Sequence, residues 1–310
     1  MSTHPRLARA AVRAGAPRAR GAGGRPPLGD PAAATPAGPV TKTRRRPIER
    51  VSFHAMGTTV TIRAVGAPRL AREVRRLEGI LTRFGDGVVA RLNREGRLQD
   101  PPPELVAALA WAVEASRLTG GLVTPLVGRS LEWHGYATSW HEGARWIAPE
   151  GTPPAVPSVD ELVVSAREIV LPPGAAIDLG GTGKTWVVER VAGRATEVVI
   201  DAGGDVLVRS AAASEVDVLG AAEGWHLRLP PGAWAVATSS LARRAWRGGH
   251  HLIDPRTGRP AQGRWVQATV VGRSLVRAEL ATKLLLLGAP VPETLQVEQA
   301  WVVDRDGTLH

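Results

Sequence analysis

The chain has 310 residues, a formal net charge of +10 and no cysteine. This length is enough for one large domain or two small ones. The absence of cysteine excludes disulfides, thiolate chemistry and cysteine lipidation. No apolar run resembles a membrane span or a signal-peptide core, so we expect a soluble, cytoplasmic protein.

The excess positive charge lies in the first 50 residues. Residues 1–50 contain eleven Arg or Lys and two acidic residues, which gives +9, so residues 51–310 carry only +1. The first segment is rich in Ala, Arg, Gly and Pro, and we predict a disordered basic tail at 1–50 and a folded domain at 51–310. The folded part has no basic stripe for DNA or RNA, so we expect no nucleic-acid partner.

The hydrophobic pattern predicts mostly strands, with a few helices between them. In chain order we expect a strand at 51–65, helices at 69–84 and 103–119, a Pro-rich linker or long loop at 148–160, strands at 163–171 and 175–179, a helix at 184–194, strands near 198–200, 206–208, 225–229, 234–238, 250–254 and 266–272, and a helix at 275–287. Strands that mostly follow strands indicate an α+β fold with a largely antiparallel sheet and flanking helices.

The segment 178–185 has the character of an anion site. It reads Asp-Leu-Gly-Gly-Thr-Gly-Lys-Thr, and differs from a phosphate-binding P-loop because Asp178 stands where that motif needs its first glycine. Its glycines leave backbone N–H groups open, the following helix start favours an anion, and Lys184 adds a positive charge. A pyrophosphate would suit this segment; the alternative is an ordinary strand–turn–helix with a surface lysine.

The densest polar cluster lies at 250–260, where two histidines, a carboxylate and arginines share a segment with turn residues. His250 and His251 are adjacent on a predicted strand and should point to opposite faces, so one can reach a site. Alone, this segment could be a surface turn. The glycine-rich segment 201–205 and the hydroxyl-rich segment 237–240 each allow a structural or a functional interpretation.

Three polar side chains share a face of the last helix, because Glu279, Thr282 and Lys283 lie at positions i, i+3 and i+4. Oxygens of the first two could ligate Mg²⁺, which prefers oxygen ligands. The alternative is a Glu–Lys pair on a solvated face.

Taken together and in this order, the segments resemble the FAD:protein FMN transferases, the ApbE family. The resemblance covers about 51–288 and rests on segments 56–58, 81–84, 90–93, 119–128, 178–190, 201–205, 237–239, 251–260, 281–282 and 287–288. It implies an ApbE-like, T-fold-like architecture. It also implies an enzyme that binds FAD and uses Mg²⁺ to transfer FMN to a Thr or Ser hydroxyl of an acceptor flavoprotein, with release of AMP.

The resemblance also implies roles for individual residues. His251 would be a base or would position the substrate, with Asp254 as a carboxylate that could help. The FAD pocket would use Met56, Phe84, Leu122, Val123, Thr124, Asp178, Lys184 and Ile253. The Mg²⁺ ligands would be the carbonyl of Gly181 and the side chains of Glu279 and Thr282.

The chain departs from the family pattern at three positions. Thr124 replaces an Asp, Gly183 replaces an Ala, and Ala278 stands where the family has a metal-binding Asp four residues before Thr282. Glu279, one residue on, could reach the same ion, or the metal site could be altered. Two alternatives to the transferase stay open: a FAD pyrophosphatase that gives FMN and AMP, and a non-catalytic FAD-binding protein.

Overall fold

A seven-stranded sheet forms the centre of the fold in the computed structural model, which describes residues 12–14, 47–139, 150–220, 224–242, 244–246 and 249–310. All neighbouring strands in it are antiparallel. In spatial order the strands are β17 (Val297–Asp304), β16 (Trp265–Gly272), β11 (Gly232–Ser240), β8 (Val206–Ser210), β7 (Val198–Ala202), β3 (Thr58–Val65) and β2 (Ile48–Ala55).

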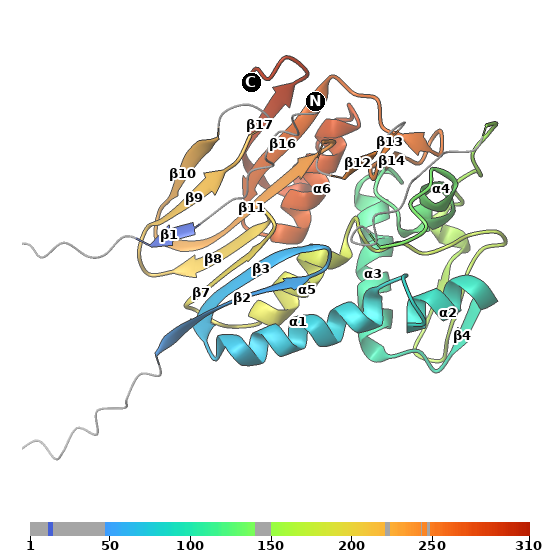
Figure 1. Ribbon diagram of the computed structural model, residues 1–310, viewed down its shortest axis with the longest axis horizontal. Coiled ribbons are helices and arrows are strands. Elements are labelled where there is room, and N and C mark those ends of the chain that lie inside the picture. Colours follow the sequence, from blue (N-terminus) through green and yellow to red (C-terminus); the bar gives the residue numbers. More distant parts are fainter. Residues whose placement is uncertain (1–11, 15–46, 140–149, 221–223, 243, 247–248) are drawn as a thin grey trace, which may run out of the picture.

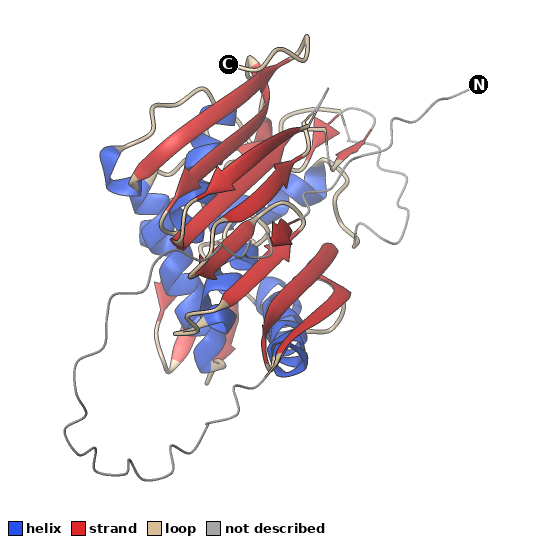
Figure 2. Ribbon diagram, turned by 90° about the vertical axis from the view of Figure 1, so that its left-hand side faces the viewer, coloured by secondary structure: helices blue, strands red, loops and turns tan. Residues whose placement is uncertain are grey.

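Helices α1 (Ala67–Leu81), α5 (Gly183–Ala192) and α6 (Leu275–Leu286) cover one face of this sheet (Figure 2). Each helix buries the side that faces the strands. In α1 the buried residues recur at helical spacing and are Ala67, Ala71, Val74, Leu77 and Leu81. The main hydrophobic core therefore lies between the helices and the sheet.

A small three-stranded sheet packs against the other face. It consists of β1 (Val12–Ala14), β9 (Ser214–Val218) and β10 (Trp225–Leu229). In β11, Ala235 and Ala237 belong to the main core, whereas Val236 joins the second cluster with Val206 and Val208. This alternation shows that the central sheet is buried on both faces along these strands.

The chain between β3 and β7 builds a second group of elements at one end of the sheet (Figure 1). The group comprises α2 (Val88–Glu95), β4 (Arg97–Gln99), α3 (Pro103–Leu118), η1 (Pro125–Val127), α4 (Gly128–Trp133), η3 (Val159–Glu161), β5 (Val163–Val164) and β6 (Glu168–Val170). After β11 come the short strands β12 (Ala245–Trp246), β13 (Gly249–His250), β14 (Ile253–Asp254) and β15 (Arg259–Pro260), and the turn η4 (Glu293–Leu295) precedes β17.

The predicted α+β class with a largely antiparallel sheet is confirmed. Four element predictions are wrong. The expected strand at 163–171 is a hairpin, because β5 turns back and pairs with β6. The expected strand at 250–254 is interrupted, since β13 ends at His250 and β14 begins at Ile253. The expected strand at 51–65 is a hairpin, because Met56 and Gly57 have φ angles of 53° and 68° and form a turn. The expected strand at 175–179 pairs with no strand in the described part of the chain.

The boundary of the predicted tail also needs correction. β2 already begins at Ile48, and Val12–Ala14 pairs with β9 as β1, so parts of 1–50 belong to sheets. Residues 1–11 and 15–46 of the predicted tail, and 148–149 of the predicted linker, lie outside the described residues. Within the described part, no helix combines the length and the apolar character that a bilayer span requires.

Candidate functional site

Most of the predicted site residues lie where the loop before α5 meets α6 and the segment before η1. A Cβ added to Gly181 would lie 3.6 Å from Lys283 Cε and 4.0 Å from Val123 Cγ1. These three residues come from three segments that are far apart in the chain. The fold therefore assembles the site at the junction between the sheet–helix layers and the second group of elements (Figure 1).

Asp178, a predicted FAD contact, forms a buried ion pair with Arg83. Arg83 Nε lies 2.5 Å from Asp178 Oδ2, and the two side chains are 4% and 11% exposed. The guanidinium also lies 4.4 Å from the ring centre of Phe84 and 5.0 Å from that of Tyr136. Asp178 Oδ1 accepts a 2.7 Å hydrogen bond from the Gly180 N–H. The carboxylate thus orders the glycine loop, and its contact with FAD stays a prediction.

Asn93 fixes the backbone immediately before Asp178. Its Oδ1 accepts a 2.7 Å hydrogen bond from the N–H of Ile177, and its Nδ2 donates a 2.9 Å hydrogen bond to the carbonyl of the same residue. One amide side chain thus satisfies both backbone groups of Ile177, as a neighbouring strand would. This explains why the segment is ordered although it is not part of a sheet.

Phe84 and Ile253, both expected beside FAD, belong to one small apolar cluster with Tyr136. The ring centres of Phe84 and Tyr136 are 5.6 Å apart. The cluster consists of Leu131, Tyr136 and Ile253, with Phe84, Val127 and Trp246 packed against them. Burial raises the pKa of the Tyr136 hydroxyl, with partial compensation by the nearby Arg244 guanidinium. The cluster offers an apolar, aromatic wall to a planar ring.

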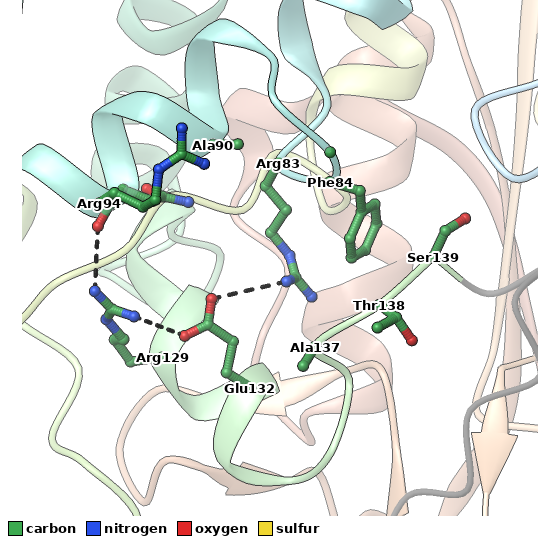
Figure 3. A pocket seen from close by; sticks show the side chains of 11 residues that line it. Arg83, Phe84, Ala90, Arg94, Arg129, Glu132, Ala137, Thr138 and Ser139 are labelled. Atoms are coloured by element: carbon green, nitrogen blue, oxygen red, sulfur yellow. Dashed lines mark hydrogen bonds and ion pairs between the residues drawn. The ribbon is translucent and has the colours of Figure 1, made fainter.

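A cavity of about 280 Å³ opens beside Phe84 and is lined by charged side chains. Figure 3 shows Arg83, Arg129 and Glu132 around it, with both guanidinium groups directed toward the carboxylate. Arg129 Nη1 lies 2.8 Å and Arg83 Nη1 lies 3.9 Å from oxygens of Glu132. Aromatic and cationic walls in one small cavity suit part of a ligand that joins a ring system to an anionic group.

The predicted pocket segment 122–124 packs directly against the site. Val123 is 5% exposed and lies beside Gly181, and Leu122 packs on the main core. Thr124 caps η1, since its hydroxyl accepts a 3.3 Å hydrogen bond from the Leu126 N–H. Thr124 therefore has a structural role at the position where the family pattern has an Asp.

Met56 lies in the β2–β3 turn, which is held from two sides. Its N–H donates a 2.5 Å hydrogen bond to Glu78 Oε1, and its carbonyl accepts a 3.2 Å hydrogen bond from Arg244 Nη2. A Cβ at Gly57 would lie 2.8 Å from Arg244 Nη2, so only glycine allows the guanidinium to approach this closely. The turn thus positions Arg244, a cation that the sequence interpretation did not single out.

Lys184, at the start of α5, forms an ion pair with Asp205. Asp205 is 2% exposed and also accepts a 3.0 Å hydrogen bond from the Thr238 N–H. The pair therefore ties α5 to the β7–β8 turn and to β11. The Lys184 side chain is 20% exposed, so an anion can still approach its ammonium group.

The residues expected to hold Mg²⁺ surround a lysine. Glu279 Oε1 lies 2.8 Å from Lys283 Nζ, and these side chains are only 4% and 9% exposed. Glu279 Oε2 accepts a hydrogen bond from the Thr185 hydroxyl. The Thr282 hydroxyl donates a 2.7 Å hydrogen bond to the Glu279 carbonyl and lies 2.8 Å from Ser239 Oγ. The Glu–Lys pair is therefore present, but it is buried and not solvated.

This donor set does not fit a divalent cation. Both oxygens of the Glu279 carboxylate are engaged, and Ala278 offers no oxygen at the family's Asp position. An ion bound to that carboxylate would also lie beside the Lys283 ammonium, which repels it. Within the described residues, no group of three His, Cys, Asp or Glu side chains gathers that could hold a metal. The assignment of Gly181, Glu279 and Thr282 as ligands stays a prediction that this arrangement does not favour.

His251 places a neutral imidazole in the site. Its Nδ1 is buried and has no hydrogen-bond partner among the described residues. Burial, and then the charges of Arg244, His250 and Lys283, lower the pKa of His251 well below its usual value of 6.5. Near pH 7 the ring is therefore uncharged, and one of its nitrogens can accept a proton.

The neighbours of His251 in the sequence stabilise the segment 250–261 through their side chains. His250 Nε2 donates a 2.9 Å hydrogen bond to the Ala261 carbonyl. Asp254 lies 2.7 Å from the Arg256 guanidinium. Although burial acts to raise the pKa of Asp254, hydrogen bonds from Arg256 bring it below its usual value. The Asp254 carboxylate thus fixes the turn, and a catalytic role for it stays a prediction.

The sequence interpretation missed three contributors to the site: Arg83, Tyr136 and Arg244. Tyr136 is the one tyrosine in the chain, and this rarity was a usable signal. Arg83 lies in the segment 81–84 that carries the resemblance, but no local pattern reveals its partner Asp178. Nothing in the local sequence distinguishes Arg244 from the chain's many other arginines, because its partner lies far away in the sequence.

Comparisons with known proteins agree with the fold. A sequence model of the ApbE family matches residues 56–300. The FAD:protein FMN transferase of Vibrio cholerae serotype O1 is 26% identical over 311 residues, which covers 84% of this chain and 90% of that protein. The crystal structure of the ApbE protein from Thermotoga maritima superposes with a TM-score of 0.69 at 19% identity, covering 85% of this chain and 96% of that one. The flavinyl transferase ApbE from Pseudomonas stutzeri, in its apo form, gives a TM-score of 0.66 at 17% identity, covering 85% and 93%.

Proposed function

The chain belongs to the ApbE family, and on this premise we propose that it is a FAD:protein FMN transferase. The substrates are FAD and an acceptor flavoprotein that carries a Thr or Ser hydroxyl. The observation that carries the proposal is the gathering of Lys184, Lys283 and the glycine loop 178–183 next to the aromatic cluster at Phe84. This combination suits FAD, because FAD joins ring systems through a diphosphate.

In the proposed reaction the acceptor hydroxyl oxygen forms a bond to the phosphorus of the FMN half. The bond from that phosphorus to the bridging oxygen breaks, and AMP leaves with this oxygen. The proton of the hydroxyl passes to a base, for which His251 is the candidate, or His251 positions the hydroxyl. The imidazole is neutral near pH 7 and so has a nitrogen free to accept a proton, although its lowered pKa makes it a weaker base than a free histidine.

The cationic groups stabilise the charge that develops on the diphosphate oxygens. Lys184 at the N-terminus of α5 supports this part of the proposal. The expectation that the glycine loop leaves its N–H groups open is wrong for Gly180, Thr182 and Gly183, whose N–H groups already donate hydrogen bonds within the loop. Arg83 and Asn93 act at a distance as positioning residues, since they hold Asp178 and the backbone before it. No step is assigned to Mg²⁺, because the donor set does not fit it; metal dependence and a cytoplasmic location stay predictions of the sequence.

The test is the intact mass of a small FMN-acceptor domain after incubation with this protein and FAD. We expect a mass gain of one FMN less one water, and no gain when the acceptor Thr is replaced by Val. AMP released without acceptor modification would instead support the pyrophosphatase. FAD binding with neither product would support the non-catalytic binding protein. Parallel samples with Mg²⁺ and with EDTA measure the metal dependence directly.

A further inference from the structure

Lys283 is a buried cation whose donors are not all used. Its side chain is 9% exposed, and its ammonium group has three N–H donors. Among the described residues, Glu279 Oε1 at 2.8 Å is its one ion-pair partner. A buried ammonium with spare donors is costly unless another acceptor reaches it. The spare N–H donors of this ammonium are therefore available to an anionic ligand.

The surroundings of Lys283 show where this anion would lie. Its Cε packs beside Gly181, where an added Cβ would lie 3.6 Å away, an ordinary van der Waals contact. Its charge acts on His251, whose pKa it helps to lower. Lys283 thus packs against the glycine loop before α5, and its charge is also felt by the candidate base.

Glu279 and Thr185 hold the lysine in this position. Glu279 lies one helical turn before Lys283 on α6, and its second oxygen accepts the hydroxyl of Thr185 on α5. Each carboxylate oxygen thus has one partner, and the two helices are joined through this link. A lysine held in this way loses less conformational entropy when a ligand binds than a free surface lysine would.

We propose that the Lys283 ammonium is a built-in cation for the FAD diphosphate, in place of a divalent metal ion. This inference rests on the proposed function, because FAD is the ligand that brings the diphosphate. Glu279 is then a positioning residue that orients the ammonium and does not ligate a metal. FAD should consequently bind to the full chain without any divalent cation.

The experiment measures FAD affinity by fluorescence titration, in EDTA and in Mg²⁺, for the full chain and three variants. Lys283→Met removes the ammonium and frees one oxygen, Oε1, of the Glu279 carboxylate. Glu279→Gln combined with Lys283→Met removes both charges at similar volume, which guards against misfolding from a lone buried carboxylate. Arg277→Met removes a positive charge from α6 at a residue that bonds the Thr294 carbonyl, and is the matched control.

We expect the unmodified chain and the Arg277→Met control to bind FAD equally well in EDTA and in Mg²⁺. Lys283→Met should weaken binding in EDTA by roughly ten- to a hundredfold, the loss of a charge-assisted hydrogen bond. Mg²⁺ should recover part of this loss in Lys283→Met, in which Glu279 Oε1 is free, and none in the double variant. Mn²⁺ binding followed by electron paramagnetic resonance should likewise appear only in Lys283→Met.

Two results would overturn the inference alone: FAD that binds the unmodified chain only with Mg²⁺, or a Lys283→Met variant that binds FAD in EDTA as tightly as the unmodified chain. If FAD binds under no condition, the proposed function is wrong, and the inference that rests on it is wrong as well. Binding that depends on Mg²⁺ leaves the transferase proposal intact, so the two failures are distinguishable.

Discussion

Replacing Arg83 by Met should destabilise the fold strongly, because it leaves the Asp178 carboxylate buried without its cation. The pair is 2.5 Å long, and the side chains are 4% and 11% exposed. Removing one partner of such a buried pair costs about 3–5 kcal/mol. The lost contacts with the Phe84 and Tyr136 rings, at 4.4 and 5.0 Å, add about 1 kcal/mol.

The double variant Arg83→Met with Asp178→Asn separates the charge effect from lost packing. It removes the stranded carboxylate, so we expect it to recover about 2–3 kcal/mol of the loss. The free energy of unfolding is measured in urea by tryptophan fluorescence for both single variants and the double variant. Arg76→Met is the control, since Arg76 forms exposed ion pairs with Glu73 and Glu104 and its loss should have little effect. A coupling energy near zero between Arg83 and Asp178 would refute the reasoning.

Three further predictions concern the same region. The lowered pKa of His251 means that the unfolded chain binds the proton more readily, so stability should fall by up to about 1.4 kcal/mol per pH unit as the pH drops below 6.5. His251→Gln should reduce the pH dependence of the free energy of unfolding, measured by urea unfolding at pH 5–8. An unchanged pH dependence would contradict this prediction. Gly203→Ala should cost more than about 2 kcal/mol, because φ is +71° and the new Cβ would overlap Thr58 Oγ1; an unchanged melting temperature would disprove this. Asn93→Leu leaves both backbone groups of Ile177 unpaired and should lower the free energy of unfolding by about 2–4 kcal/mol. Asn93→Asp should also lower it, because a carboxylate oxygen would then face the Ile177 carbonyl; an unchanged free energy of unfolding in either variant would argue against the double hydrogen bond.

Local sequence signals predicted those elements that begin and end at residues with a strong conformational preference, such as proline and glycine. Helix α3 was expected at 103–119 and spans Pro103–Leu118, because Pro103 suits a first turn and Gly120 and Gly121 end the helix. β10 was expected at 225–229 and has those bounds. The β2–β3 turn was missed, because a methionine with a positive φ is rare and carries no turn signal.

The sequence identified the site's residue types better than their partners. Glu279 and Lys283 were correctly placed on one helix face, but periodicity does not tell whether that face meets solvent or the core. Arg83 and Asp178 are 95 positions apart, and no local pattern links them. Ion pairs of this kind depend on how elements pack, which the sequence pattern of a single segment does not contain.

The sheet order has a consequence for folding kinetics. β2 pairs with β3 and β7 with β8 through nearby residues, whereas the β3–β7 pairing joins Ala64 to Val198 across the whole second group of elements. Closing that long loop costs more chain entropy than closing a hairpin, and such non-local pairings slow folding. We expect the two hairpins to form early and the β3–β7 seam late. The nascent chain would then expose the edges of β3 and β7 until the intervening helices have packed, and this interval is when the protein is most open to misassembly.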